Sequence, residues 1–306
     1  MSFPRPFSRG LAYGCWRLAG SEGAPRTPDA AGRAAVHAAL DAGYTIFDLA
    51  DIYGGGECER LFGEALRERP GSRERLTLVT KCGIRRSGVP APTDPVRYDF
   101  SGSYIRECVD ASLRRMRVDS IDLLLLHRPD YLMDPAEVAG VFVQLRDAGK
   151  VGSFGVSNFR PMHFEALRRA CPLPLDTHQI EISLAHVQAF DDGALDQCLA
   201  EGIQPMAWSP LARGALADGE LSGKDAAERA RLERIRAAMD LVAADHGTTR
   251  SVVALAWLLK HPTGIVPVVG TVNPARIAGL RAAESLRLSR EEWYRLFEAA
   301  RGARLP

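Results

Sequence analysis

The stretch IDLLLLHRPDYLMDPAEVAGVFVQLRDAGKVGSFGV, residues 121–156, decides the fold. Its first apolar run, 121–126, has the length of a buried strand. An amphipathic segment at 135–148 follows, and a second short apolar run occupies 152–156. A strand, a helix and another strand in this order predict a β/α/β unit within a parallel sheet covered by helices.

The same alternation repeats along the chain. Helix ends are marked by Asp134 before Pro135, which is typical of a helix start, and by Gly43 and Gly149, which are typical of helix ends. The expected strands are 11–16, 45–48, 76–81, 121–126, 152–156, 177–182, 204–208 and 265–269. The clearest expected helices are 29–42, 103–116, 135–148 and 192–201.

Eight such units favour a (β/α)8 barrel, formed as a single domain by residues 1–306, over an open doubly wound sheet. An open dinucleotide-binding sheet usually has G-x-G-x-x-G after its first strand, and this motif does not follow 11–16. The glycines at 54–56 come after the second strand and lack that spacing. We interpret them as a turn before a helix that begins near Glu57.

Composition excludes several classes of function. The 39 Lys and Arg residues against 38 Asp and Glu give a net charge of +1, so no overall field favours nucleic acid or an anionic membrane. No segment reaches the roughly 20 apolar residues of a membrane span, and residues 1–10 lack the apolar core of a signal peptide. The six cysteines are scattered without a CxxC pair, as reduced thiols usually are. We therefore expect a cytoplasmic protein without nucleic-acid, membrane or metal partners.

Four polar residues end or follow the predicted strands, which is where barrel enzymes place their active sites. They are Asp48, Tyr53, Lys81 and His127. Taken singly, a histidine or tyrosine at a strand end is more often structural. Together, a lysine ammonium beside the phenol lowers the tyrosine pKa from about 10, while the aspartate keeps the lysine charged. We expect Tyr53 to act as a general acid near neutrality and His127 to orient a substrate oxygen.

At these residues the chain resembles the aldo-keto reductase superfamily. The segments that carry the resemblance are FDLADIYG at 47–54, LLLLHRP at 123–129 and GVSNF at 155–159. The chain is most similar to the bacterial YdhF-like oxidoreductases, through HQIEIS at 178–183, AWSPLA at 207–212 and EEWYRLF at 291–297. The resemblance spans about residues 13–301, and the motifs are specific in combination. It implies a barrel that binds NADP(H) and transfers hydride between nicotinamide C4 and a carbonyl or alcohol carbon, with the four polar residues as the catalytic group.

The resemblance also implies contacts to the nicotinamide. Ser157, Asn158 and Gln179 are expected to hydrogen-bond its carboxamide, and Trp208 is expected to stack on its ring. Without the family context, Ser157 and Asn158 would be interpreted as a capping turn before the helix at Pro161, and Trp208 as core filling. The capping and cofactor-binding interpretations are compatible.

Further contacts lie after the first, second, seventh and eighth strands. Gly14, Cys15 and Asp48 match positions beside the cofactor, and Trp16 is expected to line the substrate pocket with Tyr53 and His127. For Cys15 and Trp16 a structural role is equally open. Ser209, Leu211, Arg213 and Gly214 match the loop along the pyrophosphate. Gly270, Thr271, Asn273 and Arg276 match the segment that holds the adenosine 2′-phosphate.

Two departures from the family pattern affect these expectations. Many members have a lysine where Gly270 stands, yet NADPH is still expected in preference to NADH. The long C-terminal loop of the steroid- and aldose-reducing branches has no counterpart after 290–301, so we expect an open substrate side.

Two alternatives to a reductase stay open. Potassium-channel β-subunits share the resemblance and serve mainly as regulatory partners that retain the cofactor. A metal-dependent barrel hydrolase would use Asp48, Asp51, His127 and His178, but an HxH pair is missing. The expected partner is a small-molecule carbonyl compound, either an aldehyde, a ketone or a ketosugar, and the family's usual state implies a monomer.

Overall fold

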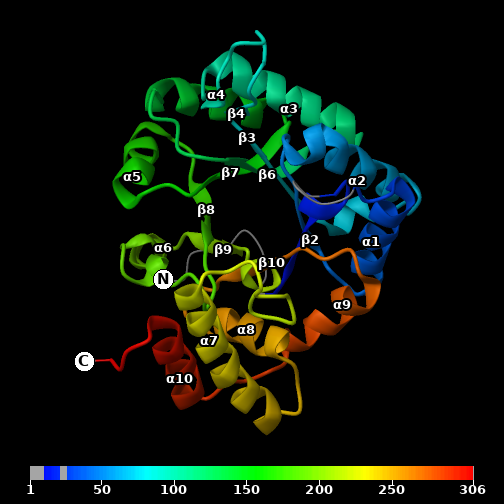
Figure 1. Cartoon of the computed structure of the whole chain (residues 1–306). Coiled ribbons are helices and arrows are strands. Elements are labelled where there is room, and N and C mark those ends of the chain that lie inside the picture. The colour runs from blue at the N-terminus through cyan, green and yellow to red at the C-terminus, as the bar shows by residue number, and fades with distance from the viewer. Residues whose placement is uncertain (1–9, 21–25, 306) are drawn as a thin grey trace.

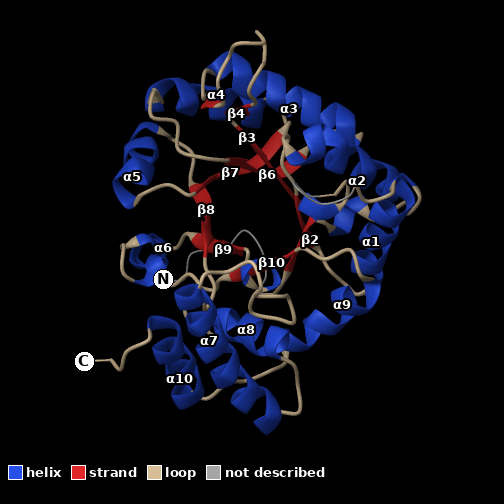
Figure 2. Cartoon of the chain, viewed as in Figure 1, coloured by secondary structure: helices blue, strands red, loops and turns tan. Residues whose placement is uncertain are grey.

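The computed structural model describes residues 10–20 and 26–305. Eight parallel strands close into a barrel in the order β1-β10-β9-β8-β7-β6-β3-β2 (Figures 1 and 2). The strands are β1 Ala12–Gly14, β2 Ile46–Asp48, β3 Thr77–Cys82, β6 Ile121–Leu126, β7 Val151–Ser157, β8 Leu175–Glu181, β9 Gln204–Trp208 and β10 Val266–Val269. The predicted (β/α)8 architecture is confirmed.

Helices surround the barrel on its outside (Figure 2). They are α1 Asp29–Asp41, α2 Glu57–Arg67, α3 Gly102–Met116, α4 Pro135–Asp147, α5 Pro161–Ala170, α6 Ala194–Glu201, α7 Ala226–Asp245, α8 Arg250–Leu259, α9 Pro274–Gly279 and α10 Arg290–Arg301. A small antiparallel sheet, β4 Ile84–Arg85 with β5 Arg97–Tyr98, lies in the segment that connects β3 to α3. None of the helices in the described residues has the length and apolar character needed to cross a bilayer.

The predicted helix ends are confirmed in detail. The Asp134 carboxylate accepts hydrogen bonds from the backbone N–H groups of Ala136 and Glu137, and it thereby caps α4. Gly149 follows α4 with a φ of 68°, in the left-handed region where glycine carries no Cβ penalty. The first strand is shorter than predicted, because the chain turns into a 3-10 helix at Cys15–Arg17 directly after Gly14.

The barrel interior is filled by one group of apolar side chains, which includes Ile46, Val79, Leu125 and Met206. Successive side chains of a strand point to opposite faces, so the residue two positions further along also faces inward. Those positions are occupied by Asp48, Lys81, His127 and Trp208, at the carboxyl ends of β2, β3, β6 and β9. The strand period therefore brings polar side chains to one mouth of a barrel whose middle is apolar.

The glycines at 54–56 form the turn that carries Tyr53. All three have positive φ, of 58°, 74° and 94°, and α2 begins at the next residue. A Cβ at Gly56 would lie 2.7 Å from the Arg115 side chain. Only glycine fits there, and the interpretation of this run as a turn before a helix is confirmed.

Candidate active site

The Lys81 ammonium is the centre of a buried polar group at the barrel mouth. Its Nζ donates hydrogen bonds to Asp48 Oδ2 at 2.8 Å, to the Leu49 carbonyl at 2.7 Å and to Tyr53 Oη at 3.2 Å. The Lys81 side chain is 0% exposed and that of Asp48 is 4% exposed. Three acceptors thus satisfy the three protons of a buried ammonium, whose charge is balanced by the carboxylate.

The second oxygen of Asp48 is also used. The Gln179 amide Nε2 donates to Asp48 Oδ1 at 2.8 Å, from β8 on the opposite side of the barrel. Asp48 therefore joins Lys81 on β3 to Gln179 on β8. The sequence prediction placed both residues at the cofactor or catalytic site but did not predict this contact.

Burial and charge set the protonation states of this group. Burial raises the pKa of Tyr53 above its ordinary value of 10, and the Lys81 charge lowers it only in part. The predicted sign of the lysine effect is correct, but the expected net fall in the phenol pKa is wrong for this structure because burial outweighs it. Burial lowers the pKa of Lys81, yet Asp48 and Tyr53 raise it more, so the net shift is upward. At neutral pH the lysine is charged and the phenol holds its proton.

His127 lies beside Tyr53, with the two rings edge to face and their centroids 5.8 Å apart. Burial, together with the nearby Lys81 and Arg128 charges, lowers the pKa of His127 well below its usual value. Its Nδ1 is buried and has no hydrogen-bond partner among residues 10–20 and 26–305. A neutral imidazole therefore gains most by carrying its proton on Nε2.

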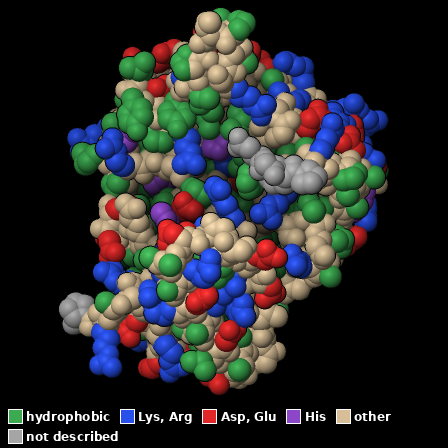
Figure 3. Space-filling model, in the orientation of Figure 1, with side chains coloured by type: hydrophobic (Ala, Val, Ile, Leu, Met, Phe, Trp, Pro, Cys, Tyr) green, Lys and Arg blue, Asp and Glu red, His purple; other side chains and the backbone are tan. Residues whose placement is uncertain are grey.

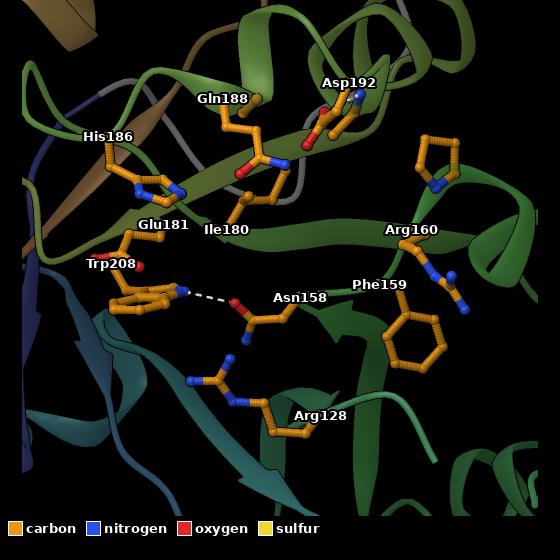
Figure 4. A pocket seen from close by; sticks show the side chains of 13 residues that line it. Arg128, Asn158, Phe159, Arg160, Ile180, Glu181, His186, Gln188, Asp192 and Trp208 are labelled. Carbon is orange, nitrogen blue, oxygen red and sulfur yellow. Dashed lines mark hydrogen bonds between the residues drawn. The ribbon is translucent and has the colours of Figure 1, made fainter. Parts of the chain in front are cut away.

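Asn158 follows β7 and is held on several sides. Its backbone has a φ of 61°, a left-handed conformation that asparagine tolerates better than most residues. Its Nδ2 donates to Ser157 Oγ at 2.7 Å. Its Oδ1 accepts from the Trp208 indole Nε1 at 2.9 Å (Figure 4). The structure brings these three predicted cofactor residues together, and the indole contact is one that the sequence did not predict.

Glu59 supports the strand that carries Lys81, although no sequence motif indicated this residue. Its side chain is completely buried in α2 and accepts hydrogen bonds from Thr80 Oγ1 at 2.7 Å and from Arg115 Nε at 2.7 Å. Thr80 precedes Lys81 on β3, and Arg115 lies in α3. The hydrogen bond to Thr80 and the ion pair with Arg115 therefore hold α2 against both β3 and α3. Removing either partner would leave a polar group buried without its acceptor or donor.

A cavity of about 580 Å³ opens beside Asn158 and Trp208. Figure 3 shows the hollow at the barrel mouth, with basic, acidic and histidine side chains around it. Its lining includes Arg128, Arg160, Glu181, His186 and Gln188, whose side chains surround the opening in Figure 4. The Arg128 guanidinium lies 5.4 Å from the centroid of the Trp208 ring. Sequence reasoning missed this lining, although Arg128 directly follows His127.

The residues after β1 are less accessible than expected. Cys15 is 0% exposed, and burial raises the pKa of its thiol well above the usual value. Neither its side chain nor its backbone has exposed surface in this structure. A Cβ at Gly14 would lie 2.9 Å from Val268 Cγ1, so a larger residue would force Val268 to shift where β1 meets β10. Trp16 is half-buried and, like Tyr53 and His127, is not among the residues that line the cavity described above.

The two predicted phosphate segments lie after β9 and β10. In the first, Ser209 and Arg213 have positive φ, of 50° and 56°, a strained backbone for non-glycine residues. In the second, Asn273 Oδ1 caps α9 by accepting from the Arg276 N–H at 3.1 Å. The Arg276 side chain is exposed, and none of the described residues accepts a hydrogen bond from it. Leu211 and Gly214 adjoin Arg213, while Gly270 and Thr271 lead into α9.

Two of the side chains considered for a metal site, those of His178 and Asp48, are used otherwise. His178 Nε2 accepts a hydrogen bond from the Phe159 N–H at 3.1 Å, and burial lowers the pKa of this histidine to about 3. Asp48 is paired with Lys81. No cluster of three or more His, Cys, Asp and Glu side chains arranged for a metal ion occurs in residues 10–20 and 26–305. The described residues therefore give the hydrolase alternative no support.

A closed parallel barrel with its polar residues at the carboxyl ends of the strands defines a (β/α)8-barrel protein with its site at that mouth. The model of the aldo/keto reductase family matches residues 10–301. The chain belongs to this family.

Related proteins agree with this assignment. A 6-dehydroglucose reductase of Novosphingobium aromaticivorans is 43% identical over 302 residues, which cover 97% of this chain and 93% of the relative. The oxidoreductase YdhF of Escherichia coli is 40% identical, over 87% of this chain and 86% of its own. A glycerol dehydrogenase structure from Gluconobacter oxydans is 27% identical and superimposes with a TM-score of 0.82, over 97% of this chain and 93% of that one. These names support an oxidoreductase.

Proposed function

We propose that this protein is an NADPH-dependent aldo-keto reductase that reduces the carbonyl group of an aldehyde, a ketone or a ketosugar. The observation that carries the proposal is the buried Lys81 ammonium, bonded to both Asp48 and Tyr53 at the mouth of the barrel. A buried ion pair is costly to desolvate and adds little to stability, so its presence at an open mouth favours a catalytic role.

The residues around the mouth fit a nicotinamide cofactor. Gln179 uses its Nε2 to bond Asp48, and none of the described residues donates to its Oε1. Ser157 is 1% exposed and presents its hydroxyl beside it, since β7 and β8 pair Ser157 with Gln179. An amide oxygen and a hydroxyl side by side suit a primary carboxamide. When bound, the nicotinamide supplies hydride from C4 to the carbonyl carbon.

The chain's own residues manage the proton and the carbonyl oxygen. Tyr53 holds its proton at neutral pH and gives it to the oxygen as negative charge develops there. The Lys81 ammonium stabilises the phenolate that is left, because it lies 3.2 Å from that oxygen. His127, neutral and protonated on Nε2, donates a hydrogen bond that orients the carbonyl.

The preference for NADPH over NADH is proposed to lie in the segment before and within α9. Arg276 offers an exposed guanidinium with no described acceptor, which matches a 2′-phosphate. Asn273 keeps only its Nδ2 for this purpose, since its Oδ1 caps α9. Thr271 Oγ1 accepts from the Asn273 N–H at 3.3 Å and retains its own proton for donation. Gly14, Cys15, Leu211, Arg213 and Gly214 are proposed to contact the cofactor further along, as the family resemblance implies.

The cavity lining favours hydroxylated carbonyl compounds within the proposed substrate class. Arg128, Glu181 and Gln188 line it, and among the described residues the one hydrogen-bond, ion-pair or ring partner of these side chains is the Trp208 ring, against which Arg128 lies. Such groups are suited to hydroxyl groups of a substrate rather than to an apolar chain. Two of the related proteins are named for a dehydroglucose and for glycerol, which are both polyhydroxylated.

The test compares cofactor binding with turnover. Calorimetric titration should show that NADPH binds more tightly than NADH, and the protein should oxidise NADPH with 4-nitrobenzaldehyde or glyceraldehyde. Tyr53→Phe should retain NADPH binding and lose roughly 100-fold or more in kcat. Equal inactivity of both proteins over a broad carbonyl panel, with cofactor bound, would instead support the alternative of a regulatory subunit.

We also propose that residues 1–306 form one domain, and that the protein is monomeric and cytoplasmic.

A further inference from the structure

Two hydrogen bonds, one from Trp208 to Asn158 and one from Asn158 to Ser157, have a fixed direction. An indole N–H can only donate, so the Asn158 atom 2.9 Å from Trp208 Nε1 must be the amide oxygen. The Asn158 Nδ2 then faces the other way, toward Ser157 Oγ at 2.7 Å. A longer contact of 3.4 Å from the same Nδ2 to the His127 carbonyl favours the same orientation. One donor on Trp208 thereby sets the orientation of the whole Asn158 amide (Figure 4).

This orientation decides what Ser157 can offer. Because its Oγ accepts from Asn158, its own proton stays free, and none of the described residues accepts it. Gln179 lies on the neighbouring strand β8, and its Nε2 donates to the Asp48 carboxylate across the barrel. Because a carboxylate can only accept, this bond fixes Gln179 with Nε2 inward and Oε1 free. The pair therefore presents one donor and one acceptor, the complement of a carboxamide C=O and NH₂.

We propose that Trp208 and Asn158 are positioning residues that fix the Ser157 hydroxyl as a hydrogen-bond donor toward the carboxamide of the nicotinamide cofactor, a role that rests on the proposed function. The Asn158 amide donates to Ser157 and, over the longer contact, to the His127 carbonyl, and its oxygen accepts from Trp208. This orientation of Ser157 by Asn158 is separate from the direct contact to the cofactor that the family resemblance implies. Trp208 has two separate effects, stacking by its ring and orientation by its N–H.

The hydrogen bonds from Trp208 to Asn158 and from Asn158 to Ser157 form a relay that sets the direction of the Ser157 proton. Removing the indole N–H breaks this relay at its first bond. In Trp208→Phe the aromatic face is kept, but the Asn158 amide is free to rotate by half a turn and place Oδ1 against Ser157. Ser157 then donates its proton to Asn158, and the carboxamide oxygen loses its donor. An unmade hydrogen bond at such a buried site costs about 1–3 kcal/mol, or roughly a 5- to 150-fold loss of affinity.

A double-mutant cycle separates orientation from stacking. NADPH affinity is measured by calorimetry for the wild type, Trp208→Phe, Ser157→Ala and the double variant. We expect Trp208→Phe to raise the Kd about 10-fold when Ser157 is present, but less than about threefold in the Ser157→Ala background, because only the stacking loss persists there. The control ligand is 2′-phospho-ADP-ribose, which lacks the nicotinamide, and its Kd should be unchanged in all four proteins.

A second variant keeps the ring and tests the same direction. In Asn158→Asp the introduced carboxylate cannot donate, so it draws the Ser157 proton to itself, and we expect about a 10-fold loss for NADPH with no change for 2′-phospho-ADP-ribose. Equal effects of Trp208→Phe in both backgrounds, with NADPH bound normally by the wild type, would overturn the relay alone. Failure of the wild type to bind NADPH would overturn the proposed function and the relay with it.

Discussion

The Lys81 ammonium lies 3.2 Å from the Tyr53 hydroxyl and 4.9 Å from the centroid of its ring. The ammonium is fully buried and the Tyr53 side chain is half-buried beside it, so the charge acts on the phenol with reduced screening by water. We make five predictions about the polar group at the barrel mouth, about the buried His178 and about the proposed cofactor and substrate sites.

The first prediction is the pH dependence of reduction. Burial raises the pKa of Tyr53 above 10, so the phenol should keep its proton through neutral pH. The rate should fall only as the pH rises through the raised pKa of Tyr53, where the phenol loses that proton. Lys81→Met removes the charge that opposes burial, so the falling limb should move to still higher pH while the maximal rate drops. Single-turnover rates measured across the alkaline range test this, and a limb that moves to lower pH in Lys81→Met would contradict it.

The second prediction concerns the Lys81–Asp48 ion pair. Asp48→Asn leaves the 0%-exposed ammonium without its counter-charge, and we expect a loss of about 3–5 kcal/mol in the free energy of unfolding in urea. Asp48→Asn combined with Lys81→Met removes both charges and should be more stable than Asp48→Asn alone. If the double variant is no more stable than the single variant, the uncompensated charge is not the cause.

The third prediction is a pH-dependent stability that comes from His178. Its pKa in the folded protein is about 3, below the ordinary 6.5, so the unfolded chain binds the proton first. Stability from this group is complete above pH 6.5 and is lost as pH falls toward 3, by up to about 1.4 kcal/mol per pH unit. Urea unfolding at several pH values gives the slope of the free energy of unfolding against pH, which counts the protons taken up on unfolding. In His178→Gln this count should fall by about one. An unchanged slope would refute the assignment.

The fourth prediction is the cofactor preference. Arg276→Ala should raise the Kd of NADPH roughly 10-fold, the value of one charge-assisted hydrogen bond, and leave the Kd of NADH unchanged. Arg290→Ala is the matched control, since Arg290 is an exposed arginine at the start of α10. Parallel losses for both cofactors would place Arg276 outside the 2′-phosphate site.

The fifth prediction concerns Arg128 and the choice of substrate. Arg128→Gln should lower kcat/KM for glyceraldehyde about 10-fold, because the guanidinium is proposed to bind a substrate hydroxyl, and should change the value for 4-nitrobenzaldehyde by less than about threefold. Arg160→Gln serves as a comparison, since Arg160 lines the same cavity from its exposed side. Equal losses for both substrates would indicate a general effect on the Trp208 ring rather than substrate choice.

The positions of the strands in the sequence were enough to predict where the polar residues gather. Residues two apart on a strand face the same way, and parallel strands end at the same mouth, so Asp48, Lys81 and His127 had to converge once the strands were placed. The resemblance added Ser157, Gln179 and Trp208, and the structure brings the first two side by side and joins Trp208 to Ser157 through Asn158.

The protonation states and hydrogen-bond directions at that mouth depend on the folded arrangement and could not be predicted. The net rise in the Tyr53 pKa depends on how completely the surrounding elements exclude water, which local sequence does not encode. The Trp208–Asn158 bond joins residues 50 positions apart, and the Gln179–Asp48 bond joins residues 131 apart. Strand periodicity brings such residues to one place, but the orientation of each amide depends on which donors and acceptors surround it after folding.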